Sequence, residues 1–182
     1  MKLKYIRGIA LLAVAGVVAC LAARDFLAMR PPLPVIPGPG VTEVRHLSAY
    51  FPSLKGSRGD TEVYLLQGRE RGGTAMVLGG VHPNEPSGHL AAVILVEKAK
   101  VHAGRLIVVA RANASGFTHN DPQEANPQAF GIPTPSGVRF FRYGSRSTSP
   151  MDQWPDPDIY LHHPSGQTLS GNQTRNLNRA FP

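Results

Sequence analysis

Two apolar runs flank a helix-forming segment in the middle of the chain, and this pattern restricts the fold more than any other feature. Residues 74–81 (TAMVLGGV) and 105–113 (RLIVVARAN) are short, continuous apolar runs of the kind buried as strands in α/β sheets. The segment between them, residues 87–100, carries apolar side chains at the spacing of one helical face: Leu90, Ala91, Ile94, Leu95 and Ala99. A strand, a helix and a strand in this order predict a right-handed crossover between parallel strands.

The remaining sequence fits an α/β domain with many loops. Residues 61–68 (TEVYLLQG) predict a further strand, and the 19 glycines and 17 prolines fall mostly between the apolar runs. Residues 113–182 are rich in Pro, Ser, Gly, Asn and Gln, which predicts a long irregular region that is either a binding surface or disordered. Six aromatic residues argue against full disorder of this region: Phe130, Phe140, Phe141, Tyr143, Trp154 and Tyr160.

The N-terminus, residues 1–23, has the layout of a secretory signal. A basic stretch precedes a 12-residue apolar run, 8–19, which leads to Cys20. Two interpretations stay open: Cys20 is the lipidated first residue of a bacterial lipoprotein, or residues 1–23 are an uncleaved anchor. Both predict an exported protein of the bacterial cell envelope that faces the periplasm or the cell exterior, because the basic residues ahead of the apolar run stay inside. The protein would contact the membrane through its N-terminus.

A proline-rich segment follows the signal. Residues 29–40 (MRPPLPVIPGPG) hold five prolines and two glycines, a composition that predicts a stiff, extended tether. The expected organisation is therefore a signal or anchor over residues 1–23, a tether over 24–40 and a folded domain over 41–182.

The formal net charge of +7 does not indicate nucleic-acid binding. Three of the 19 lysines and arginines lie in the first seven residues, which leaves 16 basic against 12 acidic residues in the rest. These basic residues form no run and no helical stripe with interleaved aromatics, so we expect no nucleic-acid partner. Most are arginines, which bind carboxylates in a bidentate way and fit an anionic small substrate.

The stretch GGVHPNEPSG, residues 79–88, places His82 and Glu85 three positions apart at the end of an expected strand. Ligand sites in parallel sheets gather beyond the carboxyl ends of the strands, and an imidazole and a carboxylate at this spacing can reach one zinc ion. Pro83 and Pro86 would make the turn rigid and lower the entropy cost of assembling the pair. The alternative is a plain helix start, with Glu85 placed favourably against the helix dipole.

A second segment, TRNLNRAFP at residues 174–182, completes a resemblance to a known family. GGVHPNE and NLNRAFP, in this order, resemble the Gly-Gly-x-His-x-x-Glu and Asp-Leu-Asn-Arg-x-Phe-Pro-Gly segments of the succinylglutamate desuccinylase and aspartoacylase family, with Asn176 in place of the usual aspartate. The family lies within the zinc carboxypeptidase superfamily. The resemblance covers about residues 60–182 and implies a doubly wound, mostly parallel sheet with zinc as the cofactor.

The resemblance also implies residue roles and an activity. His82 and Glu85 would be zinc ligands, while Asn178 and Arg179 would bind the terminal carboxylate of the substrate. The activity would be hydrolysis of an amide bond next to a carboxylate, in an N-acyl amino acid or a peptide, by a deacylase or carboxypeptidase type of enzyme.

Arg142, in FFRYGSR, is similar to the superfamily arginine that polarises the scissile carbonyl, and a cation there would stabilise the oxyanion. Arg139 or Arg146 could replace it. Solvated surface positions are the alternative for each of these arginines.

The family takes its third zinc ligand, a histidine, and its general-base glutamate from positions beyond the Asn-Arg segment. The sequence stops at Pro182, so we expect the N-terminal part of a truncated domain with little or no hydrolytic activity. We assign His119, His162 and His163 to loops rather than to the metal. A hypothesis of another class is a non-catalytic envelope module that holds anionic peptides or cell-wall fragments with its arginines and aromatic-rich loops.

Overall fold

The N-terminal unit of the chain is one long helix. In the computed structural model the chain divides into two compact units, Met1–Pro31 and Pro32–Pro182. The structure describes residues 2–28, 31, 33–121, 124, 128–153, 159–162 and 166–181. Helix α1 (Lys2–Ala28) makes up the first unit, and its 24-residue stretch Tyr5–Ala28 is long and apolar enough to cross a membrane. This is compatible with the expected signal or anchor; Cys20 lies exposed on the helix.

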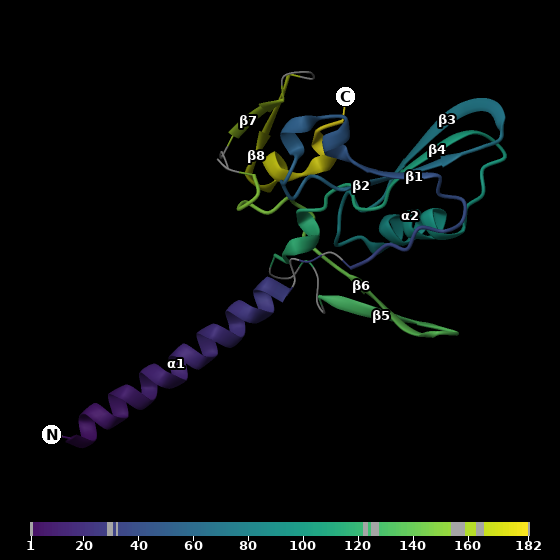
Figure 1. Ribbon diagram of the computed structural model, residues 1–182. Helices are drawn as coiled ribbons and strands as arrows, with labels where there is room; N and C mark the ends of the chain where they lie inside the picture. The colour runs from purple at the N-terminus through teal and green to yellow at the C-terminus, as the bar shows by residue number, and fades with distance from the viewer. Residues whose placement is uncertain are drawn as a thin grey trace. The chain divides into compact units, whose positions relative to one another are not determined.

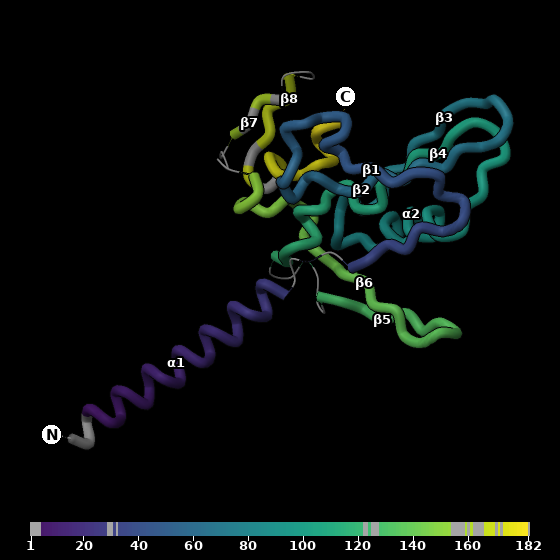
Figure 2. Tube along the Cα trace, in the orientation of Figure 1, coloured from purple at the N-terminus to yellow at the C-terminus, as the bar shows by residue number. Residues whose placement is uncertain are grey.

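The second unit contains a four-stranded sheet with one helix against one face (Figure 1). Its elements are β1 (Glu43–His46), β2 (Glu62–Gln67), β3 (Glu70–Leu78), α2 (Pro86–Lys98) and β4 (Ala103–Val109). The strand order is β1-β2-β4-β3, and β3 pairs with β4 in parallel. The chain runs from β3 through α2 into β4, as the trace in Figure 2 shows. The strand, helix and strand expected from the apolar pattern are therefore confirmed.

The chain is a mixed α/β protein as expected, but a mostly parallel, doubly wound sheet is not confirmed, because the described sheet is mixed. Among the described strands of this sheet, β1 with β2 and β2 with β4 pair antiparallel. The reason lies in the connection between β2 and β3, which consists only of residues 68 and 69. Parallel strands need a crossover of about a dozen residues or more, so a link this short reverses the chain.

Strand β3 is not buried, although its apolar run predicts a buried strand. Most of its residues are exposed, and 57% of Met76 remains accessible. Among the described strands, only β4 pairs with β3, so β3 forms an edge of the sheet. A continuous apolar run fits a covered or a half-covered strand, and the sequence does not distinguish the two.

Helix α2 buries a face that overlaps the predicted one in part. Of the predicted residues, Leu90, Leu95 and Ala99 are partly buried and pack against the core, whereas Ala91 is exposed and 61% of Ile94 is accessible. The fully buried residues are His89, Ala92, Val93 and Val96. Residues 90–96 (LAAVILV) are apolar on all sides of a helix, so their periodicity does not select one face. The buried residues pack with strand residues in one core cluster: Val35, Tyr64, Leu66, Ala92, Val93, Val96, Val108, Ala110 and Phe141.

Part of the expected tether packs onto this core. Val35 belongs to the core cluster, and the Gly38 backbone N–H donates to the carbonyl of Val96 at 3.1 Å. The Leu33 carbonyl accepts a 2.7 Å hydrogen bond from Arg111. Residues 33–40 therefore lie within the second unit rather than forming a free spacer.

The region after β4 consists of short elements. They are η3 (Gly116–Thr118), β5 (Ala129–Thr134), β6 (Gly137–Arg142), β7 (Ile159–His162), β8 (Gln167–Ser170), η4 (Gly171–Arg175) and η5 (Leu177–Arg179), where η marks a 3-10 helix. Two further 3-10 helices, η1 (Leu47–Ala49) and η2 (Pro52–Leu54), precede β2. Trp154 and His163 lie outside the described residues.

Buried hydroxyl groups help to hold this polar region together. Ser145 is fully buried and donates to Asp121 at 2.7 Å, and buried Ser115 donates to Asp152 at the same distance. Because buried polar groups are tolerated when they are hydrogen-bonded, the region packs with few apolar runs.

Candidate functional site

The loop between β3 and α2 begins with two glycines that the surrounding structure requires. A Cβ atom on Gly79 would lie 2.4 Å from the Cβ of Ala92 in α2. Gly80 has a positive φ of 64°, and a Cβ there would lie 2.8 Å from the Phe117 ring. The close approach of α2 and η3 therefore accounts for the Gly-Gly pair, and it fixes the path of the chain into His82.

His82 is buried and held at both ring nitrogens. Only 9% of its side chain is exposed. Its Nε2 lies 2.8 Å from Oδ1 of Asn176, a residue 94 positions along the chain, and its Nδ1 lies 3.3 Å from Oε1 of Glu85. The structure thus brings the two segments of the resemblance, around His82 and around Asn176, into direct contact.

Glu85 turns its side chain toward His82 rather than capping the helix. It occupies the N-cap position of α2, but its side chain makes no capping hydrogen bond. The carboxylate is 57% exposed, and Arg146 donates to the same Oε1 atom at 2.9 Å. The backbone N–H of Arg146 donates in turn to Glu124 at 2.8 Å. Glu85 Oε1 is therefore shared between an imidazole and a guanidinium.

These side chains line a cavity of about 460 Å³, which we call the His82 cavity. Its lining residues are Leu78, Gly80, Val81, His82, Glu85, Ser87, Gly88, Arg146 and Asn178. Of the predicted site residues, His82, Glu85 and Asn178 meet here. Arg146, the alternative to Arg142, lines the cavity as well.

Other predicted residues lie elsewhere among the described parts of the chain. Arg142 is half-buried at the end of β6, where burial lowers the pKa of its guanidinium, and it does not line the His82 cavity. Arg139 is paired with Glu97 of α2 at 2.6 Å, and this hydrogen bond raises its pKa. Arg179 is exposed in η5, lines a separate cavity of about 220 Å³ and donates through Nε to Gln173 at 2.8 Å.

The histidines expected in loops include one that burial affects. Only 20% of the His119 side chain is exposed, and burial lowers the pKa of its imidazole. Its Nε2 lies 4.0 Å from Asp121, and it does not line the His82 cavity.

The hydrogen bonds around His82 determine what Nδ1 can bind. The backbone N–H of Asn178 donates to Asn176 Oδ1 at 3.1 Å, which establishes that this atom is an acceptor. His82 Nε2 must therefore donate to it. When the imidazole is neutral, Nδ1 is then an acceptor, and the carboxylate oxygen Glu85 Oε1, also an acceptor, lies 3.3 Å from it. A proton or a cation between these two atoms would offset the repulsion of their lone pairs.

The side chains around His82 provide some, but not all, of the ligands that a zinc ion requires. Imidazole nitrogen and carboxylate oxygen are zinc ligands, and a metal-bound histidine usually donates its other ring N–H to an oxygen, as His82 does to Asn176. Within the described parts of the chain, however, no group of three or more His, Cys, Asp and Glu side chains is placed to hold a metal ion.

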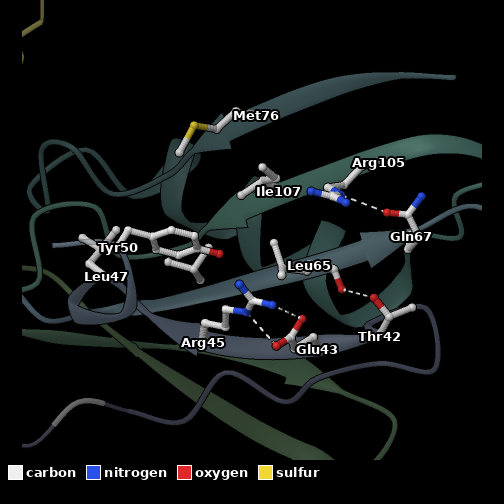
Figure 3. Close-up of a pocket in the computed structure, with 11 residues that line it drawn as sticks. Thr42, Glu43, Arg45, Leu47, Tyr50, Leu65, Gln67, Met76, Arg105 and Ile107 are labelled. Atoms are coloured by element: carbon white, nitrogen blue, oxygen red, sulfur yellow. Dashed lines mark hydrogen bonds and ion pairs between the residues drawn. The ribbon is translucent and has the colours of Figure 1, made fainter. Parts of the chain in front are cut away.

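A second cavity, of about 530 Å³, lies on the sheet face that α2 does not cover; we call it the sheet-face cavity (Figure 3). Its floor holds Leu65 and Ile107, Met76 lines it from β3, and Tyr50 stands at one end. Arg45 is paired with Glu43 at 2.6 Å. The cavity contains an apolar floor and no histidine, so it offers none of the chemistry of the His82 cavity.

Sequence reasoning missed the roles of Asn176 and Gln173 and ranked Arg146 second. Asn176 was noted only as a departure from the family pattern, and the contact with His82 spans 94 positions, beyond the range of any local pattern. Gln173 lies in η4, Arg179 in η5 and Asn176 between these two 3-10 helices with an extended backbone, so no single helical pattern marks the three residues.

The chain matches no protein-family model, no curated protein and no solved structure. The resemblance to the succinylglutamate desuccinylase and aspartoacylase family therefore depends only on the two segments GGVHPNE and NLNRAFP.

Proposed function

We propose that the His82 cavity binds zinc and that this exported chain carries part of the site of a zinc carboxypeptidase type of hydrolase. We expect little or no turnover from the chain itself, because its described residues provide no group of three metal ligands. One observation carries the proposal: Nδ1 of His82 and Oε1 of Glu85 lie 3.3 Å apart, while Nε2 of the same ring is engaged by Asn176. This is the arrangement in which a histidine offers its second nitrogen to a metal. The resemblance of both segments to one zinc hydrolase family supports the same assignment.

The other polar groups of the cavity suit a substrate with a carboxylate next to an amide. When bound, zinc activates a water molecule and polarises a carbonyl group. Arg146 brings a positive charge beside Glu85, where its guanidinium can bind a carboxylate or stabilise a developing oxyanion. Asn178 adds a neutral amide to the lining. An N-acyl amino acid or a peptide end offers both groups that these side chains recognise.

An apolar N-terminal helix supports export, with the domain in the cell envelope. Helix α1 is compatible with either a cleaved lipoprotein signal or a retained anchor. Mass spectrometry of the mature N-terminus separates the two: an intact Met1 excludes lipidation at Cys20.

Zinc titration tests the proposal. The full chain, reconstituted in lipid nanodiscs and stripped of metal, is titrated with Zn²⁺ by calorimetry. We expect one site per chain, and we expect its loss in the single variants His82→Gln and Glu85→Gln. The matched control is His46→Gln, which removes an exposed histidine of β1 and should leave binding unchanged. Zinc binding that survives the double substitution at His82 and Glu85 would refute the assignment.

Turnover is tested separately. The zinc-loaded chain is incubated with a panel of N-acyl amino acids and short peptides, and release of free amine is measured against the double variant. Equal release by both would exclude hydrolysis at this cavity.

A non-catalytic module that binds anionic peptides is the second candidate. The 2.9 Å contact between Arg146 and Glu85 favours it, because this contact satisfies the carboxylate without a metal. In that case acidic peptides should bind equally well with a chelator present and in the double variant.

A further inference from the structure

A chain of hydrogen bonds leads from His82 to the protein surface. His82 Nε2 lies 2.8 Å from Asn176 Oδ1, and Asn176 Nδ2 lies 3.2 Å from Gln173 Oε1. Arg179 Nε lies 2.8 Å from the same Gln173 oxygen. The chain begins at a residue that is 9% exposed, passes through Asn176, which is 4% exposed, and ends at the exposed Arg179.

The direction of each hydrogen bond follows from its ends. A guanidinium only donates, so the atom that Gln173 presents to Arg179 must be its oxygen. That oxygen faces the side chain of Asn176, so Asn176 must turn its NH₂ group toward Gln173. The carbonyl oxygen of Asn176 then faces His82, in agreement with the backbone N–H of Asn178, which donates to the same oxygen at 3.1 Å.

The orientation of Asn176 selects the tautomer of His82. An acceptor at 2.8 Å requires a proton on Nε2, so Nδ1 of the neutral ring carries the lone pair, 3.3 Å from Glu85 Oε1. If Asn176 were to rotate its amide by half a turn, an NH₂ group would face Nε2, and the proton would move to Nδ1. The hydrogen bonds of Arg179 and Gln173 oppose that rotation.

We propose that Arg179 is a positioning residue for His82, acting through Gln173 and Asn176 to hold the imidazole in the Nε2–H tautomer. This differs from the direct contact with a substrate carboxylate that the family resemblance implies for this arginine. Arg179 lines a cavity other than that of His82, and Asn176 belongs to the lining of that other cavity while contacting His82. The tautomer follows from the hydrogen bonds alone, whereas its use in holding zinc rests on the proposed function.

Nuclear magnetic resonance of the imidazole nitrogens tests the assignment. The full chain with ¹⁵N-labelled histidine is studied in lipid nanodiscs at about pH 9, well above the ordinary imidazole pKa of roughly 6.5, so that the neutral ring is observed. Long-range ¹H–¹⁵N correlations distinguish a protonated Nε2 from a protonated Nδ1. We expect the Nε2–H form in the native protein. A dominant Nδ1–H form would overturn the proposal.

Variants along the chain of hydrogen bonds separate positioning from general stability. Arg179→Ala should raise the Nδ1–H population of His82 several-fold, whereas Gln173→Glu, which keeps two acceptor oxygens, should preserve the native tautomer. Buried His89, whose Nδ1 lies 2.8 Å from the Ala110 carbonyl, is the internal reference and should not change in either variant. An unchanged His82 spectrum in Arg179→Ala would refute the role of this arginine, and because Arg179 is exposed, the variant should fold.

Cobalt titration of the same samples distinguishes the two proposals. Loss of a direct outer partner of a metal ligand typically costs about 10- to 100-fold in affinity, so the more distant Arg179→Ala should cost about threefold to tenfold. A single Nε2–H tautomer of His82 with no cobalt binding would support the positioning role of Arg179 and refute the zinc site. Cobalt binding together with a mixture of tautomers in the native chain would support the zinc site and refute the positioning role.

Discussion

The two cavities of the second unit have similar sizes but opposite constructions. The His82 cavity measures about 460 Å³, and its walls come from a loop in which glycines, a buried proline and hydrogen bonds leave little freedom. The sheet-face cavity measures about 530 Å³, and it lies over the apolar side chains of a sheet face that α2 does not cover. Volume therefore says little about function in this molecule. The two cavities differ instead in the chemistry of their lining and in the tightness of the segments that support it.

An alanine at Gly79, where the His82 loop passes close to α2, should cause the largest loss of stability. In Gly79→Ala the new methyl would lie 2.4 Å from Ala92 Cβ and 2.7 Å from the Gly88 carbonyl oxygen. We expect a loss of about 2–3 kcal/mol in the free energy of unfolding, since overpacking forces α2 away from β3. Gly73→Ala, in the preceding strand β3, is the matched control, because no heavy atom beyond its chain neighbours lies within 4 Å of the added Cβ. Urea unfolding of the full chain measures both, and equal losses would contradict the comparison.

Removal of the charge of Arg146 should strengthen cation binding. This guanidinium donates to the carboxylate oxygen that the cation needs, and it repels a positive ion. We expect Arg146→Gln to lower the dissociation constant for zinc about tenfold, as a charge a few ångströms away at an effective dielectric near 20 permits. Arg45→Gln, in the sheet-face cavity, is the control and should leave the zinc affinity unchanged. Weaker binding in Arg146→Gln would show that this arginine supports the metal rather than competing with it.

Acid should destabilise the fold through His89, a buried histidine of α2. Burial lowers the pKa of His89, whose ring packs against Phe117. The unfolded chain takes up a proton at this residue near pH 6.5 and the folded chain only at lower pH, so stability falls as the pH drops below about 6.5. One such group contributes at most about 1.4 kcal/mol per pH unit. In His89→Gln the fall between pH 7 and 5 should be shallower; parallel unfolding curves would contradict this.

Met76→Thr should have the smallest effect. Met76 lines the sheet-face cavity and is 57% exposed, so the change should alter the free energy of unfolding by no more than about 0.5 kcal/mol. Zinc affinity should stay the same. A loss above about 1 kcal/mol would indicate that this side chain is covered in solution, because exposed positions rarely cost so much.

The parts of the fold that sequence predicted are those set by local signals. Strands β3 and β4, the helix between them and the placement of His82 and Glu85 at a strand end all follow from apolar runs and turn residues within 40 positions. The buried face of α2 followed only in part, because residues 90–96 are apolar on every side. The antiparallel placement of β2 was available in principle from its two-residue link to β3.

The sequence did not single out Arg146 as the arginine of the His82 cavity, because its position depends on packing between segments that are distant along the chain. Strand β6 ends at Arg142, and the chain then passes Gly144, whose N–H donates to the Pro83 carbonyl at 3.2 Å. A Cβ on Gly144 would lie 2.2 Å from the Gly116 carbonyl oxygen. This close passage beside the His82 loop places Arg146, four residues after Arg142, at Glu85.

The contact between His82 and Asn176 joins positions 94 residues apart, and this separation sets the order in which the parts of the site become available as the chain emerges from its N-terminal end. The crossover can collapse as soon as β4 has emerged, but its histidine then lacks the partner that orients the ring. Only after some seventy further residues have emerged does His82 acquire its geometry. A partly emerged chain would therefore carry a formed scaffold in which this imidazole is not yet oriented.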